Sequence, residues 1–127
     1  MSSAVVPQGM EGPARRYSYS PGLASGDWLF ISGQVGRDEA GNVIEDPEAQ
    51  FVTAFENVGA ILREAGLSFG NIVDLTTFHT SFERFELFAE VKDRYLSATP
   101  HPAWTGVGVS ALALQGLLVE IKAIARR

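Results

Sequence analysis

The chain has 127 residues, 46% of them hydrophobic, a net charge of −5 at neutral pH and no cysteine. This length and composition are typical of one folded domain. The acidic balance, with ten Lys and Arg residues in all, argues against a nucleic-acid or anionic membrane surface as partner. The lack of cysteine excludes disulfides, thiolate nucleophiles and cysteine-ligated metals, and it predicts a cytoplasmic protein.

The first residues lack the features of a targeting or membrane-spanning segment. Residues 1–16 carry Gly, Pro and Ser, without a positively charged start followed by an apolar core. We therefore predict a flexible N-terminal arm over residues 1–16 and a single domain over residues 17–127.

The first strong strand signal is the segment DWLFISGQV at residues 27–35, which is apolar at both odd and even positions. Such a strand is expected to be covered on both faces of its sheet. Gly33 interrupts the run, and a glycine in a strand marks either a bulge or the close approach of another backbone or a ligand. Residues 43–45 are predicted to form a short strand that completes a hairpin.

A long amphipathic helix follows. Asp46 supplies an N-cap, Pro47 suits the first helical position, and Gly66 ends the helix. Its apolar face consists of residues spaced by three and four positions: Phe51, Phe55, Val58, Leu62 and Ala65.

Another strand and a second amphipathic helix come next. Residues 72–79 alternate as a strand does, with these side chains expected on one face: Val73, Leu75, Thr77 and His79. Thr80 and Glu83 have the form of a capping box, and they predict a helix that ends near Thr99 and Pro100.

The C-terminal part contains two apolar runs, residues 102–109 and 117–125, which predict two adjacent antiparallel strands. Glu120 lies inside the second run. A carboxylate in so apolar a strand must reach the solvent or be held by partners, because burying it alone is costly or raises its pKa. Glu120 is therefore the first candidate for a functional residue.

The elements follow the order β, β, α, β, α, β, β. Two helices with one-sided apolar faces can cover only one face of a sheet of about five or six strands. Alternate residues of the strands are apolar on both sides. The uncovered face must then be buried by something else, and we expect another copy of the chain in a closed homo-oligomer.

Familiar catalytic and cofactor patterns are missing. The chain has no glycine-rich phosphate loop, and Ser32 has Phe30 and Gln34 at the positions where a serine nucleophile elbow requires glycines. The two histidines, His79 and His101, do not have the spacing of metal ligands. We predict no metal site and no cofactor.

A set of short motifs runs along the chain: Tyr19-Ser20, Gly26 to Gln34, Glu56-Asn57, Pro102-Ala103 and Val119 to Ala125. In this order and spacing they resemble the RidA family, also called the YjgF family. The resemblance implies an α+β fold, with a mixed six-stranded sheet and two helices packed on one face, similar to the small chorismate-mutase trimers. It also implies a homotrimer whose sheets pack into a central barrel, with ligand clefts between the subunits.

The best-known members of the family hydrolyse reactive enamines and imines to 2-keto acids and ammonia. They hold the substrate carboxylate with an Arg that follows Pro-Ala, and Trp104 stands at that position here. An indole has one N–H donor and no charge, so carboxylate binding is expected to be weaker by about 2–5 kcal/mol. We therefore expect a Rid-family small-molecule hydrolase of altered specificity rather than the usual imine deaminase. Trp104 itself could form an apolar wall of the cleft, stack on a planar ligand or fill the subunit interface.

The resemblance also indicates which residues line the cleft. Tyr19, Ser32 and Gly33 match ligand-binding positions, and Glu120 matches an acid that positions or activates a water molecule. The Asn that the family carries in its second helix is replaced by Ala89.

His79 is a second candidate catalytic residue. If its side chain points into the cleft, His79 and Glu120 could form an acid–base pair that works near neutral pH. In the other interpretation, His79 is hydrogen-bonded to backbone at a strand end. Arg37 and Arg94 are either replacement cations for the missing Arg or solvated surface residues.

An alternative function is that of a non-catalytic trimeric module which binds a small molecule or another protein, because the carboxylate clamp is lost while Glu120 is retained. A ribonuclease role, sometimes attached to this family, gets little support from the acidic net charge.

Overall fold

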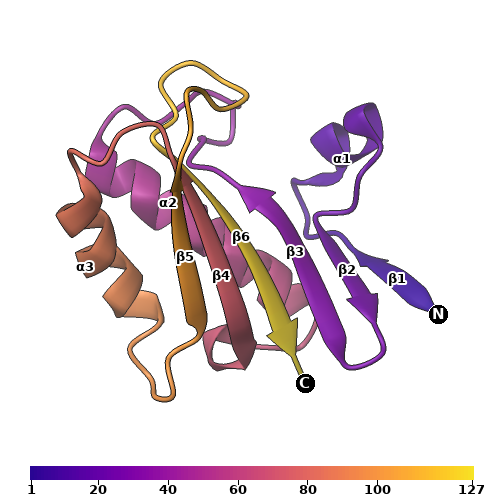
Figure 1. The fold of residues 1–127 in the computed structure, drawn as a ribbon. Coiled ribbons are helices and arrows are strands. Elements are labelled where there is room, and N and C mark those ends of the chain that lie inside the picture. Colours follow the sequence, from indigo (N-terminus) through magenta and orange to yellow (C-terminus); the bar gives the residue numbers. More distant parts are fainter.

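A mixed six-stranded β-sheet runs through the protein in the order β1-β2-β3-β6-β4-β5, with helices packed behind it (Figure 1). The structure is a computed structural model that describes residues 1–127. The elements, in chain order, are β1 (Ser2–Val5), α1 (Glu11–Tyr17), β2 (Gly22–Ser25), β3 (Trp28–Gln34), α2 (Pro47–Glu64), the 3₁₀ helix η1 (Phe69–Asn71), β4 (Ile72–His79), α3 (Phe85–Tyr95), β5 (Ala103–Gly108) and β6 (Val119–Arg126). The α+β fold predicted from the sequence is confirmed.

The two C-terminal strands are not neighbours, contrary to the sequence prediction. Strand β4 lies between them, pairing with β5 in parallel and with β6 in antiparallel fashion. Parallel strands cannot be joined by a tight turn, and here α3 provides the crossover from β4 to β5. The connection over residues 109–118 then brings the chain past β4, so that β6 inserts between β3 and β4.

Helix α2 begins and ends as its sequence predicts. The Oδ2 atom of Asp46 accepts a hydrogen bond from the backbone N–H of Ala49 at 3.0 Å, and Pro47 is the first helical residue. Gly66, just beyond the last turn, adopts a positive φ of 75°, which glycine tolerates without steric cost.

The predicted capping box of the second helix is wrong. Helix α3 begins at Phe85, and Arg84 at its N-cap forms no side-chain capping bond. Thr80 instead donates a hydrogen bond from its hydroxyl to the backbone oxygen of Leu117 at 2.9 Å. This bond ties the end of β4 to the segment before β6, and the tertiary contact prevails over the local motif.

Two further segments differ from the prediction. The strand expected at residues 43–45 is reduced to a single bridge between Arg37 and Val43. The expected N-terminal arm over residues 1–16 carries regular structure: β1 pairs with β2, and α1 buries Ala14. These segments are too short for a periodic signal, and β1 is held by the backbone hydrogen bonds that the edge of β2 offers.

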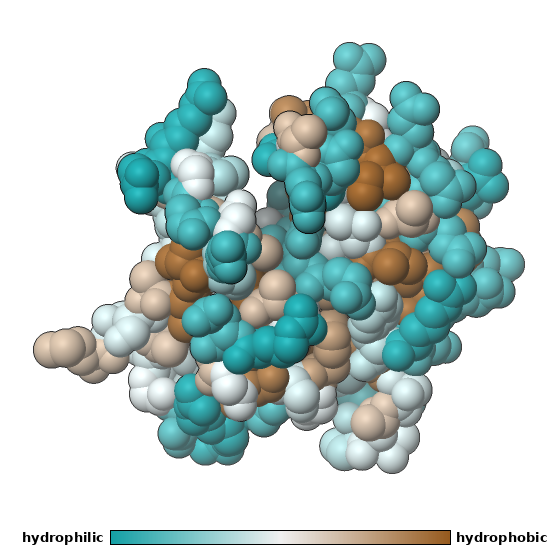
Figure 2. All heavy atoms as spheres, turned by 180° about the vertical axis from the view of Figure 1, so that it is seen from behind, coloured by the Kyte–Doolittle hydropathy of each residue, from teal (hydrophilic) through white to brown (hydrophobic).

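The two faces of the sheet differ in what covers them. One face packs against α2 and α3 and supplies most of the strand residues in the core: Leu29, Ile31, Leu75, Val119, Ile121, Ala123 and Ala125. The other face carries Trp28 and Phe30, each 43% exposed, and no helix covers it. Seen from behind, the helix-covered side is mostly hydrophilic (Figure 2). The prediction of an uncovered sheet face with apolar side chains is thus confirmed.

Candidate functional site

The residues predicted to form the site fall into two groups on opposite faces of the sheet. Glu120 pairs with Phe78, whereas its neighbour Val119 pairs with His79. Successive side chains of a strand point to opposite faces, so Glu120 lies on the uncovered face and His79 on the helix-covered face. Within one chain the structure does not bring His79 and Glu120 together as an acid–base pair.

The first group is centred on Glu120 and Gly33. The register of β3 against β6 shifts between Ile31 and Gln34, which places Gly33 in a bulge. A Cβ atom added at Gly33 would lie only 2.5 Å from the Cδ atom of Glu120. The glycine therefore marks both a bulge and a close approach, and the group that approaches is the Glu120 side chain.

The Glu120 carboxylate has no protein partner. It takes part in none of the side-chain hydrogen bonds, and the one ion pair of the chain joins Arg94 and Glu48. Burial raises the pKa of Glu120 above its usual range. An unpaired, half-buried carboxylate lowers stability, and such groups concentrate at functional sites, where a raised pKa favours proton exchange with water or a substrate.

Ser32 and Tyr19 have different surroundings, and neither forms a hydrogen bond with Glu120. The Ser32 hydroxyl donates to the backbone oxygen of Ser20 at 2.6 Å, so it holds the start of β2 against β3. Tyr19 is 43% exposed and lines an open cavity of about 850 Å³ together with Gly33. The hollow beside the N-terminal part of the chain is visible in Figure 2. Arg37 is the one basic residue among those that line it.

The second group is centred on Trp104. Its partner on β4 is Leu75, a core residue, so the indole lies on the helix-covered face. The indole N–H donates to the Thr77 hydroxyl at 3.0 Å, and the ring stacks on Phe85 with 5.6 Å between centroids and 9° between planes. Both the polar atom and the ring of Trp104 are therefore engaged within its own subunit.

His79 lies beneath this group and is 2% exposed. Its Nε2 atom lies 2.7 Å from the Thr77 hydroxyl oxygen, and the rings of Phe82, Phe85 and Phe88 pack around it at centroid distances of 5.2, 5.2 and 4.9 Å. Burial lowers the pKa of His79, which keeps the imidazole neutral near pH 7. The expected alternative, a bond to backbone, is replaced by a bond to a hydroxyl side chain.

Lys92 of α3 belongs to the same group and was not singled out from the sequence. It is 8% exposed, and its ammonium nitrogen lies 4.4 Å from the centroid of the Trp104 ring. The stem of Lys92 is buried, no carboxylate pairs with its ammonium, and a cation–π contact contributes only about 0.5–2 kcal/mol. One signal was available, because Lys92 follows Phe88 by four residues and thus shares its face of the helix.

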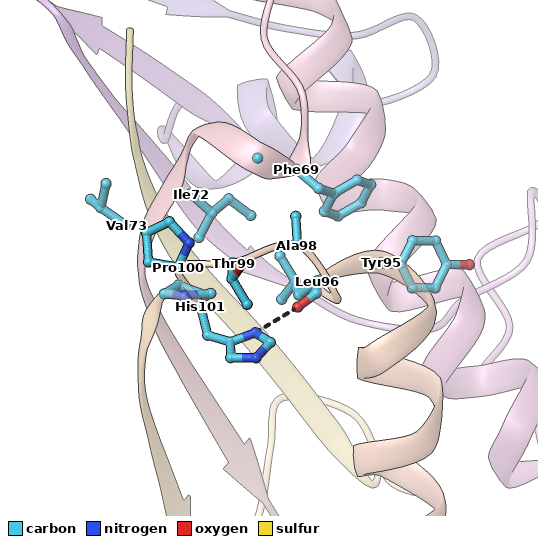
Figure 3. A pocket seen from close by; sticks show the side chains of 11 residues that line it. Phe69, Ile72, Val73, Tyr95, Leu96, Ala98, Thr99, Pro100 and His101 are labelled. Carbon is cyan, nitrogen blue, oxygen red and sulfur yellow. Dashed lines mark hydrogen bonds between the residues drawn. The ribbon is translucent and has the colours of Figure 1, made fainter.

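A second cavity of about 250 Å³ lies between η1, the start of β4 and the α3–β5 connection (Figure 3). His101 is exposed, and its Nδ1 atom lies 3.3 Å from the Leu96 carbonyl oxygen. This cavity shares no lining residue with either group.

No cluster of three or more His, Asp or Glu side chains is arranged to hold a metal ion. No helix has the length and apolar character needed to cross a membrane.

This architecture, a mixed sheet with helices on one face and an uncovered apolar face, defines an α+β protein with the fold of a known family. Residues 10–127 match the family model described as Endoribonuclease L-PSP. The chain belongs to this family, which includes the YjgF and RidA proteins.

Individual relatives agree with this assignment. The chain is 46% identical to the RutC family protein YjgH of Escherichia coli over 125 residues, which are 98% of this chain and 94% of the relative. A solved structure of a protein named YJGH, at the same 46% identity, superposes with a TM-score of 0.89 and covers 98% of this chain and 95% of its own. The 2-iminobutanoate/2-iminopropanoate deaminase of Capra hircus is 34% identical, with 89% of this chain and 82% of the relative covered.

Proposed function

We propose that this protein is a homotrimeric Rid-family hydrolase of the cytoplasm that acts on a small molecule in clefts between subunits. The observation that carries the proposal is the Glu120 carboxylate, which lies against the bulge at Gly33 without a hydrogen bond or ion pair and with a raised pKa. A group of this kind can take a proton from a bound water molecule and return it to a leaving group.

The uncovered face of the sheet supports a cleft made by two subunits. Glu120 lies on this face, whereas Trp104 and His79 are packed beneath the helices of their own subunit. A second copy of the chain seated on the uncovered face would enclose Glu120. Trp28 and Phe30, each 43% exposed, favour such an association, because burying their remaining apolar surface is favourable by about 25 cal/mol per Å².

The reaction class follows from the family and from this carboxylate. A water oxygen adds to the carbon of a C=N bond while Glu120 takes one of its protons. That proton, and then the second one, passes to the nitrogen, which leaves as ammonia as the C=O bond forms. Glu120 ends the cycle in its starting state, and the products are a carbonyl compound and ammonia.

The specificity is proposed to differ from that of the family's usual imine deaminases, because Trp104 replaces the Arg and its indole N–H is occupied by Thr77. The name of the Capra hircus relative supports an imine as the substrate type.

The experiment is an assay with freshly generated 2-aminoacrylate and larger enamines, which follows keto-acid formation by the wild type and by Glu120→Gln. We expect a substrate whose hydrolysis the wild type accelerates and Glu120→Gln slows by about 10²- to 10⁴-fold, the usual contribution of a general base. Sedimentation velocity on the same samples should give a trimer. Equal rates for the two proteins, or a monomer at micromolar concentration, would refute the proposal.

A second candidate function is a non-catalytic trimeric module that binds a small molecule or another protein. It is favoured by the way Trp104 is engaged with Thr77 and Phe85, which leaves no Arg-like group on β5 to grip a substrate. Ligand binding without any turnover, and unchanged by Glu120→Gln, is the result that this candidate predicts.

A further inference from the structure

Lys92 is the one Lys or Arg residue in the buried set, and nothing in the fold balances its charge. The ion pair of Arg94 with Glu48, at 3.1 Å, is the only one in the chain. No carboxylate of α3 therefore forms an ion pair with the Lys92 ammonium, and no side-chain or backbone oxygen accepts a hydrogen bond from it.

Trp104 fixes the place of this ammonium. The nitrogen lies 4.4 Å from the centroid of the indole, whose N–H is held by Thr77 and whose ring stacks on Phe85. An immobile aromatic ring beside the charge limits the positions that the flexible lysine stem can adopt. The surrounding side chains therefore restrict the position of the ammonium group.

The ammonium also remains accessible. No fully buried side-chain nitrogen or oxygen in the chain lacks a hydrogen-bond partner, so the nitrogen of Lys92, which has none, must keep contact with the surface. Trp104 belongs to β5, the last strand of the sheet, and the outer edge of β5 is unpaired. A ligand can therefore reach the cation where its nitrogen contacts the surface.

We propose that Lys92 of α3 binds the anionic group of the ligand, in place of a cation on β5. Trp104 contacts the ammonium of Lys92, and Lys92 binds the acid group of the ligand. The inference rests on the proposed function in one respect, because it takes the bound anion to be part of the substrate. Binding of an anion at Lys92 does not itself require catalysis.

The test uses pyruvate as a carboxylate probe and pyruvamide as its uncharged counterpart, with the indole N–H signal of Trp104 as reporter. Trp28→Phe identifies which of the two indole signals belongs to Trp104. We expect pyruvate to shift this signal in a saturable way and pyruvamide to leave it unchanged. Lys92→Met should weaken pyruvate binding at least about tenfold, and Lys92→Arg should retain most of it. The matched control, Arg94→Met, removes a surface cation of the same helix and should bind as the wild type does.

Thermal unfolding shows whether Lys92→Met is folded. Because methionine keeps an apolar stem at this largely buried position, the variant should unfold cooperatively, with a melting temperature near that of the wild type. A pyruvate shift that is absent from the wild type, or equal in folded Lys92→Met, overturns the inference.

Glu120→Gln separates this inference from the proposed function. It should keep the pyruvate-induced shift while losing turnover. Pyruvate binding that depends on Lys92, in a protein without hydrolase activity, would refute only the hydrolysis. Hydrolysis that depends on Glu120 but not on Lys92 would refute only the anion site.

Discussion

The two faces of the sheet hold polar groups under opposite conditions. On the helix-covered face, Thr77, His79 and Trp104 are buried or half-buried and are linked by side-chain hydrogen bonds of 2.7 and 3.0 Å. On the uncovered face, Glu120 is half-buried and has no partner. Linked groups stabilise the subunit and are hard to recruit for chemistry. An unlinked group weakens the subunit and remains available to a ligand. The comparison therefore favours Glu120 as the reacting group and a structural role for Thr77, His79 and Trp104.

The sharpest way to test the contrast is Gly33→Ala. The added Cβ would lie 2.5 Å from the Glu120 Cδ atom, and the flexible end of this side chain can swing away. We expect turnover to fall by about 10²-fold, as for a reacting group displaced by roughly an ångström, while the melting temperature changes little. Gly12→Ala, where no atom lies within 4 Å of the new methyl group, is the matched control and should keep full activity. If Gly33→Ala lowered the melting temperature enough to unfold the protein under assay conditions, the loss of activity would reflect a structural role of Gly33.

The opposite pattern is expected on the helix-covered face. Trp104→Phe keeps an aromatic ring but removes the N–H that donates to Thr77, and one lost hydrogen bond costs about 0.5–1.5 kcal/mol. Denaturant unfolding should therefore show reduced stability. Trp28→Phe, on the uncovered face where the indole is 43% exposed, should change the unfolding free energy of the subunit less. Equal effects of the two substitutions would remove the distinction between the faces.

The smallest effect is the dependence of stability on pH, for which the two faces have opposite signs. Burial lowers the pKa of His79 from 6.5, so its stabilising contribution is present above pH 6.5 and is lost as the pH falls. Burial raises the pKa of Glu120 from 4.5, so its ionised form destabilises the subunit at neutral pH, and acid relieves this towards pH 4.5. Only the signs of the two effects follow from burial, and solvent screening reduces the effect of half-exposed Glu120.

Unfolding free energies of wild type, His79→Gln and Glu120→Gln across this range check both signs. His79→Gln should remove the loss of stability below pH 6.5. Glu120→Gln should exceed the wild type at neutral pH and approach it near pH 4.5. A slope that neither substitution changes would mean that other groups control the acid response.

Local signals predicted the parts of the fold that depend on local physics. The N-cap at Asp46, the apolar spacing of α2 and the break in β3 at Gly33 are each defined by neighbours in the sequence, and all three were found. The place of β4 between β5 and β6 depends on a partner more than thirty residues away, for which no local pattern exists.

The candidate site was predictable only residue by residue. Glu120 was found because an acid in an apolar strand is anomalous, and Trp104 because it departs from a family motif. The separation of His79 from Glu120 depends on strand register, which the sequence does not define. Lys92 resembled an ordinary charged residue of an amphipathic helix, and its spacing of four residues from Phe88 did not reveal its contact with the Trp104 ring on β5.

The first strand of the chain has a protective role that its sequence does not suggest. Ser2–Val5 occupies the hydrogen-bonding edge of β2 over Gly22–Ser25. A chain trimmed of these residues would present the bare edge of β2 to its surroundings, and an open strand edge is a template on which foreign chains add. Because β1 is the last strand on that side, truncation would move the free edge of the sheet from β1 to β2 and would remove the backbone pairing that holds β2 on its outer side.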